Sequence, residues 1–125
     1  MDKLDLSSST IKKYRNDKEL VEATVNQIIK DFALYGLEIN YPKELTYTWQ
    51  EVYLELEKQI RYLLEINSAK ILSLLYQIDI PENKILEKVD EEKTKLLSEV
   101  VSEMIMEREL KKVLTRLYFK NLKSS

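Results

Sequence analysis

The segment "TYTWQEVYLELEKQI", residues 46–60, contains a helix start signal and the beginning of an apolar stripe. Thr48 is a candidate N-cap and Glu51 stands three residues later, which is the spacing of a capping box. Apolar residues then recur every three or four positions as far as Ile78, as on one face of a helix. The segment therefore predicts a long helix over residues 49–78, which can kink or break at Asn67.

A helix is also predicted upstream of this segment. Apolar residues at three- and four-residue spacing indicate a helix over residues 17–35. Asn16 is its candidate N-cap, and Gly36, the only glycine, stands where a left-handed C-terminal cap is needed.

Two more helices are predicted downstream. Pro81 suits the first position of a short helix over residues 82–89. Asp90 is a candidate N-cap for a final helix over residues 91–121, in which lysines lie toward the C-terminal end.

We therefore expect an all-α fold, an up-and-down helical bundle with three major helices and one short helix. Residues 1–15 are largely polar and are predicted to form a flexible N-terminal tail, and residues 16–125 a single domain. The N-terminus lacks the apolar core of a signal peptide, and no apolar run approaches the roughly 20 residues of a membrane span. We expect a cytoplasmic protein that does not act at a membrane.

The predicted final helix changes its apolar face near Met106. The faces of its two halves are centred more than about 100° apart at helical spacing. Either the second face packs against a second copy of the chain, or one bundle rotates its contacts internally. For the first alternative, the predicted homodimer interface consists of Met106, Leu110, Val113, Leu114 and Leu117.

The composition excludes several kinds of chemistry. The chain has no histidine and no cysteine, so it lacks the commonest general base and every thiolate nucleophile or thiolate metal site. One glycine excludes the phosphate-binding loop and the dinucleotide fingerprint. Glu99, Glu103 and Glu107 form a ladder on one helix face. Such a ladder can hold a hard cation or supply paired acids, but it is typical of a solvated surface with partners such as Lys95 and Lys111. We expect no catalytic activity, no cofactor and no metal.

The C-terminal segment "RELKKVLTRLYFKNLKSS" carries six basic residues and one acidic residue. Arg108, Lys112, Arg116 and Lys120 recur every fourth residue and form a basic stripe. The stripe can bind an anionic partner such as a nucleic acid, or it can be a solvated face that complements the helix dipole.

The aromatic residues allow a further interpretation. Trp49, Tyr53, Tyr62 and Tyr76 can line an apolar ligand pocket or an enzyme site, although such residues at helical spacing are usually core.

Two segments, "LLYQIDIPENK" (residues 74–84) and "ERELKKVLTR" (residues 107–116), resemble short uncharacterised helical proteins of bacteria. That resemblance covers the C-terminal half and implies no site residue. We expect a non-catalytic protein-interaction or scaffolding module that acts as a homodimer. The alternative is a nucleic-acid or ribosome-associated protein that binds through the basic stripe.

Overall fold

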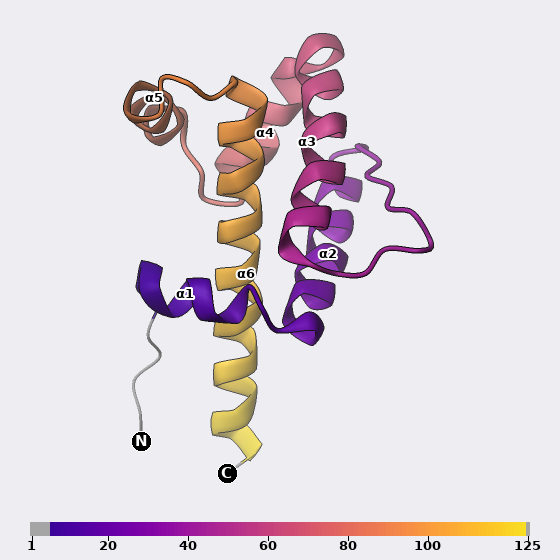
Figure 1. Cartoon of the computed structure of the whole chain (residues 1–125), viewed down its shortest axis with the longest axis vertical. Helices are drawn as coiled ribbons and strands as arrows, with labels where there is room; N and C mark the ends of the chain where they lie inside the picture. Colours follow the sequence, from indigo (N-terminus) through magenta and orange to yellow (C-terminus); the bar gives the residue numbers. More distant parts are fainter. Residues whose placement is uncertain (1–5, 125) are drawn as a thin grey trace.

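The computed structural model describes residues 6–124, and all regular structure in this range is helical, as the sequence predicts. The helices are α1 Ser8–Tyr14, α2 Lys18–Ala33, α3 Trp49–Ile66, α4 Ser68–Gln77, α5 Glu82–Glu91 and α6 Leu97–Ser124. Figure 1 shows α6 as the central axis, with α2 and α3 packed alongside it and α1 lying across it. Within the described range there are thus six helices, where three major helices and one short helix are predicted.

The long helix predicted over residues 49–78 is divided at Asn67 into α3 and α4. Asn67 has a non-helical backbone, with φ −153° and ψ 49°, so the helical hydrogen-bond ladder is interrupted there. The buried face nevertheless continues from Ile60 on α3 to Ile71 and Leu74 on α4, all fully buried. The break changes the direction of the chain between α3 and α4 without ending the apolar stripe (Figure 1).

The predicted N-terminal tail is wrong over Ser8–Tyr14, which form α1. Ile11 is fully buried and packs with Leu110 and Leu114 of α6 in a small cluster separate from the main core. One apolar side chain among polar neighbours is too weak a periodic signal to predict a helix from sequence. Residues 1–5, the rest of the predicted tail, lie outside the described residues.

The capping signals of α2 are partly as predicted. The N-cap is Asp17 and not Asn16, because the Asp17 carboxylate accepts from the Leu20 amide at 3.2 Å. Gly36 has φ +70°, and Leu37 donates back to the Phe32 carbonyl at 3.0 Å, which closes the C-terminal turn. The prediction for Gly36 is therefore confirmed.

Replacing Gly36 with Ala should lower the free energy of unfolding by about 1 to 2 kcal/mol. A Cβ at this position would approach only Lys70 Nζ, at 3.6 Å, so the cost comes from the positive φ and not from a clash. Urea unfolding measures the loss. Gly36→Asn is the control and should cost less, because Asn tolerates this backbone conformation. A G36A variant as stable as the wild type would contradict the assignment.

The last helix begins at Leu97, six residues later than predicted, because Asp90 and Glu91 belong to α5. Glu99 accepts from the Leu96 amide at 2.7 Å and so satisfies one amide at the start of α6. Close by, Ser98 donates to the buried Glu57 carboxylate at 2.6 Å, and Arg61 pairs with the same carboxylate. These polar contacts join the start of α6 to α3.

Candidate interaction surface on the last helix

Four of the five predicted interface residues are buried within a single chain. Met106 and Leu110 are fully buried, and Val113 and Leu114 are 5% and 6% exposed. The prediction that these four form an open face for a second copy is therefore wrong. Their partners are the main core for Met106 and Ile11 of α1 for Leu110 and Leu114. The change of apolar face is absorbed inside one bundle, which is the alternative left open by the sequence.

Half of the predicted basic stripe is engaged in contacts within the chain. Arg108 donates from Nε to the Ile78 carbonyl at 3.0 Å and lies 3.6 Å from the Asp79 carboxylate. Lys112 Nζ contacts Asp31 at 2.8 Å. Arg116 and Lys120 are exposed on the last turns of α6. Two members of the stripe are thus occupied within the chain, and the two members at its C-terminal end are exposed to solvent.

Lys112 belongs to a buried polar cluster that sequence reasoning missed. Asp31 on α2 is 5% exposed and accepts from Gln27 as well as from Lys112, both at 2.8 Å. Glu109 is 1% exposed, and neither of its carboxyl oxygens has a hydrogen-bond partner among the described residues. The signal in the sequence was the position of Glu109, three residues after Met106, within the apolar spacing of α6.

Burial, assisted by the Asp31 charge, raises the pKa of Glu109 to about 8. Burial also acts to raise the pKa of Asp31, but Glu109, Lys112 and Gln27 outweigh it, and the pKa is lowered. Near neutral pH the cluster therefore holds a protonated Glu109 and an ionised Asp31. A protonated Glu109 carries one O–H donor, for which the Asp31 carboxylate is the natural acceptor.

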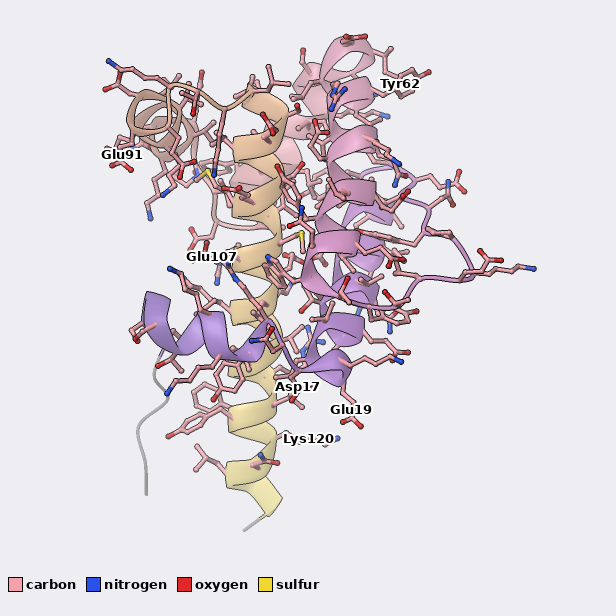
Figure 2. The ribbon with its side chains drawn as sticks, in the orientation of Figure 1. Asp17, Glu19, Tyr62, Glu91, Glu107 and Lys120 are labelled. Carbon is pink, nitrogen blue, oxygen red and sulfur yellow. The ribbon has the colours of Figure 1, made fainter. Side chains whose placement is uncertain are left out.

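Beyond this cluster, α6 projects past α1 and α2 as a single helix (Figure 1). Leu117 and Phe119 are 39% and 54% exposed there, and the Phe119 ring packs edge-on against Tyr118 at a centroid distance of 5.4 Å. Figure 2 places Lys120 on this projecting end. Leu117 of the predicted interface therefore lies on the last turns of α6 together with Arg116 and Lys120 of the predicted basic stripe. We call Arg116, Leu117, Phe119 and Lys120 the α6 end surface.

The surface charge near this end is positive. From Arg108 to Ser125 the chain has six basic residues and one acidic residue, and the acidic one is the buried Glu109. With a pKa of about 8, Glu109 is mostly uncharged near neutral pH. The sequence of the segment therefore has an excess of basic residues, of which Arg108 and Lys112 are paired with Asp79 and Asp31.

The predicted acidic ladder is paired with groups of the protein. Glu103 contacts Lys95 at 2.9 Å, Glu107 lies 3.5 Å from Arg15, and Glu99 accepts from the start of α6. Across residues 6–124, no three carboxylate, histidine or cysteine side chains gather in a group that could hold a metal ion.

The four aromatic residues proposed as a pocket lining do not come together. Trp49 and Tyr53 line a cavity. Tyr62 and Tyr76 are 61% and 71% exposed and line none of the cavities described here, and Figure 2 shows Tyr62 pointing outward near the C-terminal end of α3. The predicted four-residue pocket is therefore wrong as a set.

No family model, curated protein or solved structure matches the chain. Every helix between residues 6 and 124 is too short or too polar to cross a membrane.

Proposed function

We propose that the protein is a non-catalytic interaction module that binds an acidic surface of a partner protein through the α6 end surface. The observation that supports this function is the exposure of two apolar and two basic side chains on a helix end that projects from the bundle. Exposed apolar side chains gathered on one helix, with charges beside them, are typical of a site for a protein partner.

An acidic protein fits this surface better than a second copy or a nucleic acid. A two-fold contact between identical ends would bring Arg116 and Lys120 of both copies together, and like charges at a contact oppose association. A nucleic acid requires a broad basic field, whereas the net charge of this chain is −2 and the engaged half of the stripe is neutralised internally. An acidic partner uses both the charge and the apolar contacts.

The test compares variants in affinity capture from the cells that produce the protein, followed by reconstitution with the captured partner. Arg116→Glu/Lys120→Glu should abolish capture, because it reverses both charges. The control, Lys43→Glu/Lys58→Glu, makes the same charge change at exposed positions off α6 and should retain it. With the purified partner, the charge reversal should raise Kd at least about tenfold, and added salt should weaken wild-type binding.

Three outcomes would contradict the proposal. Equal capture by both double variants would remove the α6 end surface from binding. Capture abolished by nuclease would assign the surface to nucleic acid. A molar mass of a dimer over a hundredfold concentration range, lost in Leu117→Ser/Phe119→Ser, would assign it to the second copy expected from the sequence.

A further inference from the structure

Two adjoining chambers lie beside Trp49, at the meeting of α1, α3, α5 and α6. The outer chamber has a volume of about 560 Å³ and the inner chamber one of about 470 Å³. They share Lys12, Arg15, Trp49 and Gln50 as lining residues, so they lie on either side of the same side chains, and we refer to the pair as the cleft. Chambers of this size are typical of sites for small organic molecules.

The outer chamber is cationic. Lys12, Arg15 and Lys18 line it, and no Asp or Glu does. Lys12 and Lys18 have no ion pair with another described residue. Tyr47, also in the lining, is held at φ +58°, a conformation that is costly for a bulky residue and that occurs at ligand sites.

Arg15 connects the two chambers. Its guanidinium carbon lies 4.8 Å from the centre of the Trp49 ring, and it stands 3.5 Å from Glu107, which Figure 2 shows on the α6 side facing α1. Its Nε has no hydrogen-bond partner among the described residues. Arg15 is thus a positioned cation whose planar fork suits an oxyanion.

The inner chamber is lined by three aromatic or apolar side chains and by carboxylates that form ion pairs with Lys or Arg. Trp49, Tyr53 and Met104 supply two aromatic rings and a thioether. Each of its three carboxylates lies within 4 Å of a Lys or Arg nitrogen; these carboxylates are Glu92, Glu103 and Glu107. Most of the other lining residues are charged, so a flat ring can lie against Trp49 and Tyr53 on one side of this chamber only.

We propose that the cleft binds a small phosphate monoester of an aromatic or similarly flat alcohol. The phosphate lies among Lys12, Arg15 and Lys18 in the outer chamber, and the flat body lies against Trp49 and Tyr53 in the inner one. A dianion suits three cations, of which only Arg15 is paired with a carboxylate of a described residue, better than a single negative charge does. This site is separate from the α6 end surface and does not depend on the function proposed above.

Trp49 is the only tryptophan, so its fluorescence reports directly on the cleft. Phenyl phosphate, titrated at low ionic strength, should change the emission saturably with a half-saturation on the order of 1 mM, as expected for so small a ligand. Inorganic phosphate and phenol, each carrying one half of the probe, should bind at least about tenfold more weakly. Phenylacetate tests the head group and should be weaker than phenyl phosphate.

Lys12→Ala/Lys18→Ala should raise the half-saturation concentration about tenfold, with an unchanged melting curve to show that the variant folds. Lys13→Ala/Lys30→Ala is the matched control, since both lysines are exposed on the same two helices and line neither chamber. The proposal is overturned if phenyl phosphate causes no saturable change, if inorganic phosphate binds as tightly, or if both double variants weaken binding equally.

Discussion

Between about pH 5 and pH 8 the free energy of unfolding should fall by about 3 to 5 kcal/mol, and Glu109→Gln should remove this fall. Burial raises the pKa of Glu109 from 4.5 to about 8, and each unit corresponds to about 1.4 kcal/mol. In the unfolded chain the carboxyl ionises near its ordinary pKa, while in the folded protein it stays protonated. The stability contribution is therefore complete below about pH 4.5 and is lost as the pH rises to about 8.

The other charged groups around Glu109 add no pH dependence of stability between pH 5 and pH 8. Asp31 on α2 has a lowered pKa, so its contribution is lost only as the pH falls below its ordinary value of 3.8. Lys112 and Arg108 on α6 both act to lower the pKa of Glu109 but do not overcome its burial. The chain has no histidine, so no other side chain has an ordinary pKa between 5 and 8.

Urea unfolding at four pH values across this range measures the effect. Gln keeps the shape of Glu, and its amide can donate to Asp31, so Glu109→Gln should be nearly independent of pH and more stable than the wild type at pH 8. Glu107→Gln, the same change on a partly exposed side chain of the same helix, should retain the wild-type slope. A slope in E109Q equal to that of the wild type would show that Glu109 is not the titrating group.

The helices that sequence reasoning found are those with both a repeated apolar face and an end signal. The Thr48 cap and the Gly36 turn mark ends that the structure reproduces, because caps depend on contacts within a few residues. The predicted capping box forms only in part, since the Glu51 carboxylate accepts from Thr46 and not from the Thr48 amide.

The predicted start of α6 is wrong because α5 continues through Asp90 to Glu91, although an acidic side chain is unfavourable in a last helical turn. Glu99 accepts from the Leu96 amide at the start of α6. The position of this start depends on the residue at which α5 ends.

The candidate site was harder to predict, because burial of α6 depends on α1. The apolar stripe through Leu110 and Leu114 is evident in the sequence, but what covers it is Ile11, about a hundred residues earlier in the chain. The charges show the same dependence on distant partners. Lys112 and Arg116 look equivalent along the stripe, yet Lys112 contacts Asp31 on α2 whereas Arg116, one turn later, is exposed. Local sequence patterns predict which residues share a helix face. Contacts with distant parts of the chain decide whether that face is buried or exposed.

Leu110→Ala should lower the free energy of unfolding by about 2 to 5 kcal/mol, since it removes a fully buried side chain and leaves a cavity. Leu117→Ala makes the same chemical change on the same helix at a side chain that is 39% exposed, and should cost less than about 1 kcal/mol. Urea unfolding and solution molar mass, measured on both variants, check the prediction. An interface residue would give the opposite pattern, with a changed molar mass and little loss of stability in the monomer.

The same substitution also tests whether α1 is seated on α6. Ile11 and Leu110 share one small cluster, so the cavities left by Ile11→Ala and Leu110→Ala overlap and the two losses should not add. We expect a coupling free energy of about 0.5 to 3 kcal/mol in the double-mutant cycle. The double variant should lose less unfolding free energy than the two single variants lose together. Ile11→Ala with Ile71→Ala is the control pair, because Ile71 lies in the main core and should couple little. Additive losses for Ile11 and Leu110 would mean that α1 does not cover α6 in solution. The apolar stripe of the last helix would then be open to a partner after all.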